Sequence, residues 1–127
     1  FNYYRMVAHY QLDEFYVMNT GFTWETQDRE SDIAAATATW EHAARLLRDP
    51  EVQVVVLDEL TYMLTYGYLP ADEVIQALRD RPADQHVIIT GRNASKALID
   101  MADTVSEVTD VKHAFNAGVK VQKGIDY

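Results

Sequence analysis

The sequence contains no cysteine, and this absence excludes disulfide frameworks, thiolate zinc sites and cysteine nucleophiles. Basic residues are also scarce, because 11 lysines and arginines stand against 20 aspartates and glutamates, with a formal net charge of −9 at pH 7. This charge opposes non-specific attraction to nucleic acid or to an anionic membrane. We therefore expect neither as a partner, and any polyanionic ligand has to be held by local groups.

Long apolar runs and closely spaced glycines are missing as well. The longest aliphatic run, Val54–Leu57, is far shorter than the roughly 20 residues that cross a bilayer, so we expect no membrane-spanning segment. A phosphate loop needs two glycines five positions apart, followed by Lys and Ser or Thr. None of the five glycines has a partner at that spacing, so the phosphate cradle of P-loop enzymes is absent from these 127 residues.

Hydrophobic side chains make up 48% of the 127 residues, enough for a real core without covalent staples. We expect one α/β domain over 1–127, with an irregular segment at 1–14. Helical periodicity predicts helices over 31–49, 60–66, 71–79 and 95–102. Short apolar runs predict strands over 15–18, 52–57, 86–90 and 104–108.

Strands that alternate with helices predict βαβ units, and hence a mostly parallel sheet with flanking helices. The unbroken aliphatic runs of the strands at 52–57 and 86–90 are typical of strands that are covered on both faces. Ligands of such sheets bind beyond the carboxyl ends of the strands. We therefore expect the chemistry where four loops meet, at 19–26, 58–59, 90–93 and 109–113.

An acidic pair, Asp58 and Glu59, directly follows four consecutive aliphatic residues. P-loop enzymes present acidic residues to Mg²⁺ and a bound phosphate in this way, and carboxylate oxygens are ligands that this cation prefers. Acidic residues at strand ends also cap the helix that follows. Both interpretations stay open at this point.

Aromatic and basic residues in the other loops have two interpretations each. Phe22 and Trp24 either anchor a core or offer a flat apolar platform to a planar ligand. Arg92 follows a predicted strand and either clamps phosphate oxygens through its planar fork or is a solvated turn residue. Lys112 belongs, with Lys120 and Lys123, to a cationic cluster that either holds an anion or solvates the surface.

Three parts of the sequence together resemble one family. They are the aromatic segment 20–27, the acidic strand end 54–63, and the segment 87–92 followed by 111–120 and 124–127. These segments resemble the ATP:corrinoid adenosyltransferases of the P-loop, RecA-like type. The resemblance implies a RecA-like architecture whose first strand and phosphate loop lie upstream of residue 15. Since 1–14 does not match them, we expect a longer natural chain, with a shortened paralogue as the alternative.

The resemblance also implies an activity, which is transfer of the 5′-deoxyadenosyl group of ATP to a cobalt(I) corrinoid with release of triphosphate. Phe22 and Trp24 match aromatic residues that occupy the lower corrinoid face and displace the axial base. Glu59, with Asp58, matches acids that bind Mg²⁺ with the nucleotide, and Arg92 matches a residue at the triphosphate, with Lys112 a further candidate for nucleotide binding.

The same resemblance implies a cytoplasmic homodimer that receives its electron from a flavoprotein. Two other functions remain open. One is a corrinoid-binding or regulatory module without transferase activity, and the other is a fragment of another RecA-like ATPase.

Overall fold

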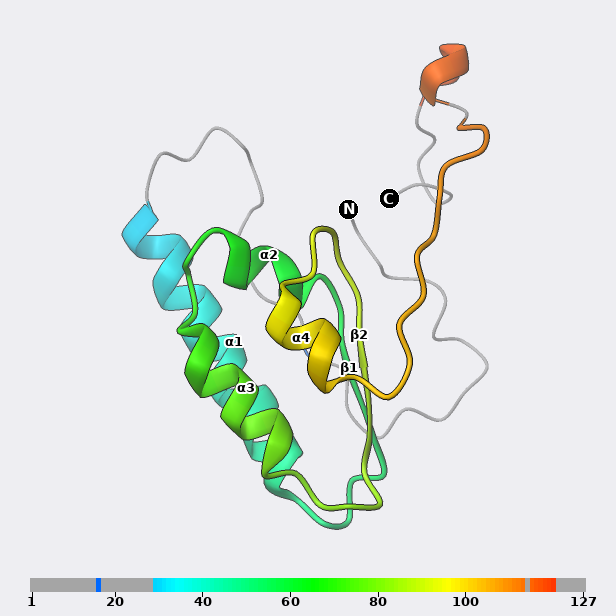
Figure 1. Ribbon diagram of the computed structural model, residues 1–127. Helices are drawn as coiled ribbons and strands as arrows, with labels where there is room; N and C mark the ends of the chain where they lie inside the picture. The colour runs from blue at the N-terminus through cyan, green and yellow to red at the C-terminus, as the bar shows by residue number, and fades with distance from the viewer. Residues whose placement is uncertain (1–15, 17–28, 114, 121–127) are drawn as a thin grey trace. The chain divides into compact units, whose positions relative to one another are not determined.

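The computed structural model describes residues 16, 29–113 and 115–120 (Figure 1). The predicted strand at 15–18, apart from Tyr16, and the loop with Phe22 and Trp24 lie outside the described residues. The described chain belongs to two compact units, divided after Asp103. The unit that ends at Asp103 contains every α-helix and strand of the described chain, and the other contains a short 3-10 helix, Phe115–Ala117.

The helices and strands of the larger unit follow the predicted order. They are α1 (Arg29–Arg48), β1 (Val54–Leu57), α2 (Leu60–Thr65), α3 (Ala71–Arg79), β2 (His86–Ile89) and α4 (Lys96–Met101). The bounds of α3 are as predicted, and every other end lies within two residues of its prediction. α1 begins two residues earlier than predicted, where Arg29 donates from Nη2 to the carbonyl of Tyr66 at 3.0 Å. No helix of the described chain is long and apolar enough to cross a membrane.

β1 and β2 form a parallel pair, with Val54 opposite His86 and Leu57 opposite Ile89. Parallel strands need a crossover connection, which α2 and α3 supply here. The predicted α/β class and the parallel pairing are therefore confirmed.

The prediction of a strand over 104–108 is wrong. No strand is assigned there, and Val108 is 95% exposed. A run rich in valine and threonine fits a strand only where a partner strand accepts its backbone hydrogen bonds. Among the described residues none is bonded to 104–108 in this way.

One face of the sheet packs on α1 and α3, which lie side by side (Figure 1). Val55 of β1 belongs to the same core as the buried residues of the two helices. These recur at helical spacing and are Ala36, Trp40, Ala44 and Leu47 in α1 and Val74, Ile75 and Leu78 in α3. Thr37, which follows the buried Ala36 in α1, is exposed. Its hydroxyl donates to the carbonyl of Ile33 at 2.8 Å.

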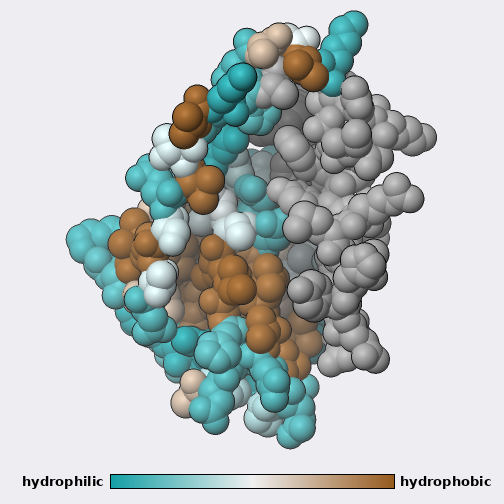
Figure 2. Space-filling model, turned by 90° about the vertical axis from the view of Figure 1, so that its right-hand side faces the viewer, coloured by the Kyte–Doolittle hydropathy of each residue, from teal (hydrophilic) through white to brown (hydrophobic). Residues whose placement is uncertain are grey.

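The other face of the sheet is not covered by described residues. Val54, Val56 and Ile88 are each more than half exposed, and apolar side chains gather in one area of the described surface (Figure 2). Within the described part of the chain, the prediction of strands covered on both faces is therefore wrong. The reason is that α1 and α3 both lie on the face that carries Val55.

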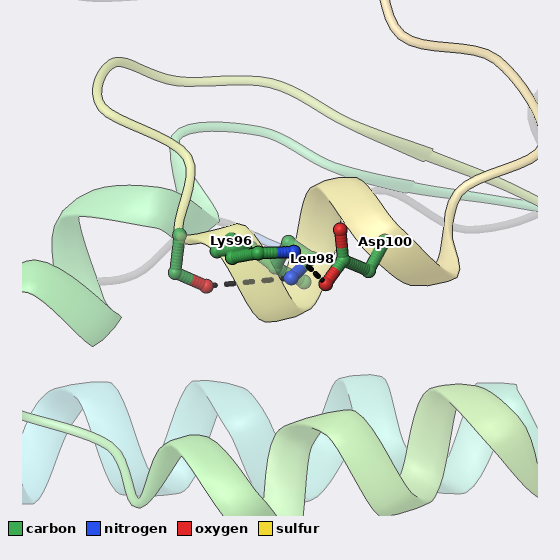
Figure 3. A network of polar contacts seen from close by, with 4 residues as sticks. Lys96, Leu98 and Asp100 are labelled. Atoms are coloured by element: carbon green, nitrogen blue, oxygen red, sulfur yellow. Dashed lines mark hydrogen bonds and ion pairs between the residues drawn. The ribbon is translucent and has the colours of Figure 1, made fainter.

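Polar side chains stabilise α4 and the start of β2. Ser95 caps α4 by accepting a hydrogen bond from the Leu98 N–H at 3.4 Å, and Lys96 pairs with Asp100 at 2.5 Å one turn along (Figure 3). Gln85 precedes β2, is 3% exposed and donates from Nε2 to the carbonyls of Leu46 and Val52 at 3.0 and 2.9 Å. Gln85 thereby ties the end of α1 and the entry of β1 to the entry of β2.

Candidate active site

The register of the parallel strands brings Asp58 and Thr90 together. Leu57 is opposite Ile89, so the residue after each of them leaves the sheet at the same edge. The Thr90 N–H donates to the Leu57 carbonyl at 3.2 Å and extends the ladder by one hydrogen bond. The predicted loops 58–59 and 90–93 are therefore neighbours, as expected of the carboxyl ends of parallel strands.

A single hydroxyl joins the two loops. Thr90 Oγ1 donates to Asp58 Oδ1 at 2.5 Å and accepts from the backbone N–H of Glu59 at 2.9 Å. A threonine hydroxyl has one hydrogen to donate and two lone pairs to accept, so both hydrogen bonds form together. Thr90 was not among the predicted site residues, because its role depends on the strand register.

Glu59 has an unusual backbone conformation, with φ 59° and ψ 20° in the left-handed region. Only glycine adopts this region freely, and another residue has a free-energy cost of about 1–2 kcal/mol. Glu59 stands at the N-cap of α2, yet its side chain makes no capping hydrogen bond. The interpretation of the acidic pair as a helix cap is therefore not what the structure shows.

Burial raises the pKa of the Glu59 carboxyl, the neighbouring Asp58 carboxylate raises it further, and Arg92 opposes both by lowering it. The side-chain oxygen Oε2 of Glu59 is buried and has no hydrogen-bond partner among the described residues. An acceptor of this kind is uncommon in a folded protein. It indicates a carboxylate that the fold leaves available for a ligand.

Gly91 allows the second loop to lie directly on α2. A Cβ built on Gly91 would lie 1.9 Å from Thr61 Oγ1, and its φ of 139° disfavours any side chain. Thr61 is 4% exposed, and its hydroxyl has no hydrogen-bond partner in the described chain. Gly91 lies in the predicted loop 90–93, but its contact with Thr61 was not predicted, because a close approach of two backbone segments has no signal in the local sequence.

Arg92 follows Gly91 and is exposed. Its positive charge lowers the pKa of the Glu59 carboxyl, so Arg92 lies near the acidic pair. That these residues form a ligand site stays a prediction. Lys112 is exposed and belongs to the other unit, and its role stays a prediction. Phe22 and Trp24 lie outside the described residues.

The site fits a magnesium ion that arrives with a phosphate ligand. Within 29–113 and 115–120, no group of three or more His, Cys, Asp or Glu side chains could hold a metal by itself. Mg²⁺ is ordinarily bound through one or two carboxylates together with substrate phosphates and water. Asp58 and Glu59, with the unpaired Oε2, supply that donor set.

The fold and the site define an α/β protein with a parallel sheet and an acidic site at the carboxyl ends of its strands, an architecture compatible with a P-loop-like fold. The chain belongs to the family described as ATP:corrinoid adenosyltransferase BtuR/CobO/CobP, whose model matches residues 3–127. The family drawn from the sequence is thereby confirmed. The match begins at residue 3, so the expectation that residues 1–14 do not match the family is wrong for 3–14.

Named relatives agree with the family. The chain is 63% identical over 114 residues to corrinoid adenosyltransferase CobA of Salmonella typhimurium. These residues make up 90% of this chain and 58% of that protein. It is 60% identical to the corrinoid adenosyltransferase of Escherichia coli, with the same coverage. For the Pseudomonas aeruginosa enzyme the identity is 56%, over 89% of this chain and 56% of the relative. The chain thus spans a little over half the length of these relatives.

Proposed function

We propose that the protein transfers the 5′-deoxyadenosyl group of ATP to a cobalt(I) corrinoid and releases triphosphate. Family membership and the names of the relatives, which are corrinoid adenosyltransferases, support this reaction. The observation that carries the proposal is the pair Asp58 and Glu59 at the carboxyl edge of the sheet, where Thr90 bonds to both and Oε2 of Glu59 has no hydrogen-bond partner among the described residues.

The roles proposed for these residues follow from charge. In the reaction the bond between C5′ of ATP and the triphosphate oxygen breaks as cobalt(I) attacks C5′ with an electron pair, and negative charge develops on the leaving triphosphate. A bound Mg²⁺ supplies positive charge against the triphosphate. Asp58 and Glu59 would hold this ion, and Arg92 would donate charge-assisted hydrogen bonds to the leaving group.

Further parts of the proposal concern residues that the site does not include. Phe22 and Trp24 would lie against the lower corrinoid face and exclude the axial base, and Lys112 would contact the nucleotide. A RecA-like sheet with a phosphate loop, a cytoplasmic homodimer and a flavoprotein electron donor complete the proposal. Support for these parts comes from the family resemblance.

An anaerobic transfer assay tests the proposal. Chemically reduced cobalt(I) corrinoid, ATP and Mg²⁺ are mixed with the protein, both as the 127 residues and together with any residues encoded before Phe1. A light-sensitive adenosylated corrinoid is the expected product. Corrinoid binding without this product in either form would indicate a binding module, and ATP hydrolysis without corrinoid binding would indicate another ATPase.

Glu59→Gln tests the acidic pair within the same assay. Loss of the carboxylate charge should lower the rate of transfer about 100-fold, the size typical of removing one electrostatic group from a site. Corrinoid binding, followed by its absorbance spectrum, should change little. Glu73→Gln is the matched control, because Glu73 is exposed on α3. A variant that loses corrinoid binding and transfer in equal measure would contradict the role proposed for Glu59.

A further inference from the structure

We propose that Thr90 is a positioning residue for the acidic pair and that its hydroxyl sets the orientation of both Asp58 and Glu59. This inference rests on the proposed function, because it assigns to Thr90 a part in the reaction of that site. Thr90 itself touches neither substrate nor metal in this proposal. It acts through the two hydrogen bonds that its Oγ1 makes at 2.5 and 2.9 Å.

The first hydrogen bond acts on the Asp58 side chain. Asp58 is exposed in a turn, where an aspartate ordinarily exchanges between rotamers. The hydrogen bond from Thr90 comes from the neighbouring strand and selects one of them, with Oδ1 occupied. Oδ2 is then left to meet a ligand in a defined position, which is the advantage of a preorganised site.

The second hydrogen bond acts on the Glu59 backbone. A residue other than glycine keeps a left-handed conformation only where its surroundings hold it. Two hydrogen bonds flank Glu59, one from its N–H to Thr90 Oγ1 and one from the Tyr62 N–H to its carbonyl at 3.1 Å. The second lies within the first turn of α2, so Thr90 provides the tertiary contact that holds this conformation and directs the side chain.

Threonine suits this role better than a more flexible residue. Its β-branched side chain has few accessible χ1 rotamers, and Thr90 is half-buried at the end of β2. The direction of its hydroxyl is therefore restricted before any ligand binds. Valine has the same shape without the hydroxyl, and serine keeps the hydroxyl without the methyl group.

The chain offers a matched control in Thr61. Its hydroxyl is also buried beside the loop that carries Gly91, yet it has no hydrogen-bond partner among the described residues. Thr61→Val removes a hydroxyl from the same neighbourhood without removing a link between the strands. Comparison of Thr90→Val with Thr61→Val separates the effect of the two hydrogen bonds from a change in local polarity.

Two measurements on the purified protein test the proposal. The first is amide hydrogen exchange at Glu59 by NMR, which needs no ligand. Thr90→Val should speed this exchange at least about tenfold, because the N–H loses its acceptor, whereas Thr90→Ser and Thr61→Val should leave it close to wild type. The second is the transfer assay at several Mg²⁺ concentrations, in which Thr90→Val should lower kcat about 10–100-fold, the usual effect of removing a group that orients a metal ligand.

The variants also separate positioning from general damage to the fold. Thr90→Val should retain corrinoid binding and a KM for ATP within about threefold of wild type, and Thr90→Ser should recover most of the rate. Unchanged Glu59 exchange and unchanged kcat in Thr90→Val would overturn the proposal, as would a Thr90→Ser variant as impaired as Thr90→Val. Should Thr90→Val not fold, Thr90→Ala takes its place in both measurements.

Failure of the proposed function gives a different result. It would appear in the wild-type protein, as absence of adenosylated corrinoid. Exchange at Glu59 in Thr90→Val would still decide whether Thr90 positions the acidic pair.

Discussion

The two ends of β2 are fastened by different chemistry. Before the strand, the Gln85 amide donates to backbone carbonyls, those of Leu46 and Val52 at 3.0 and 2.9 Å and that of Asp49 at 3.3 Å. After the strand, the Thr90 hydroxyl joins an ionisable side chain, Asp58, to the backbone of Glu59. One link connects neutral backbone groups, and the other holds a pair of acids.

β2 has only four residues, yet the contacts at its start stabilise the fold and the contacts at its end position the candidate site. The partners of Gln85 are neutral backbone carbonyls within the fold, so that end of the sheet serves stability. The other end keeps a strained residue, two adjacent acids and an unpaired Oε2 on Glu59. Arrangements of this kind are destabilising and persist at functional sites.

Gly91→Ala should have the largest effect, because it forces the loop after β2 away from α2. The new Cβ would lie 1.9 Å from Thr61 Oγ1 and 2.9 Å from Thr61 Cβ. Overpacking together with backbone strain should lower the free energy of unfolding by about 3–5 kcal/mol, as measured by urea denaturation.

Gly67→Ala is the matched control for this variant. Gly67 also has a positive φ, of 66°, but the nearest atom to its added Cβ would be 3.8 Å away. We expect this variant to lower the free energy of unfolding by about 1 kcal/mol, because alanine disfavours a positive φ. Equal losses in the two variants would contradict the close contact between Gly91 and Thr61.

Gln85→Leu should have the next largest effect and should act on stability alone. It removes the donor of the Val52 carbonyl, whereas the carbonyls of Leu46 and Asp49 keep the backbone N–H groups of Asp49 and Val52. An unsatisfied buried group has a free-energy cost of about 1–3 kcal/mol. We expect a loss of about 2–3 kcal/mol in the free energy of unfolding, with Glu59 amide exchange unchanged in the folded state. Gln76→Leu is the control, because Gln76 is exposed and its side chain donates from Nε2 to Asp80 Oδ1 at 2.8 Å on the surface of the protein. This variant should change the free energy of unfolding by less than about 0.5 kcal/mol. A Gln85→Leu variant with altered Glu59 exchange would break the separation between the two ends.

The same comparison explains what could be predicted from the sequence. The loops that carry Asp58, Glu59 and Arg92 could be predicted to be neighbours because an aliphatic run marks a buried strand, and residues after such strands share one edge of a parallel sheet. Thr90 and Thr61 were missed because their roles arise from register and close packing between segments about 30 residues apart. The strand predicted over 104–108 failed for a related reason, since its local pattern does not reveal whether a partner strand is present.

Glu59→Gln should have the smallest effect on stability. The sign of its change in Tm tests most directly whether the two ends of β2 differ. Burial and Asp58 raise the pKa of Glu59 in the folded protein, so the folded state binds this proton more tightly than the unfolded state does. Stability therefore falls as the pH rises from the ordinary glutamate value, about 4.3, through the raised folded value. At pH values above the raised pKa, the charged side chain destabilises the folded state. Glu59→Gln should therefore raise Tm at pH 7 by about 1–2 °C, a small gain because the side chain is partly solvated. Below about pH 4, where Glu59 is protonated in both states, the gain should disappear. Thermal denaturation of the wild type and the variant, followed by circular dichroism across this range, measures the difference. A Tm lowered at pH 7 would instead make Glu59 a stabilising residue and place the carboxyl end of β2 in the same class as the Gln85 end.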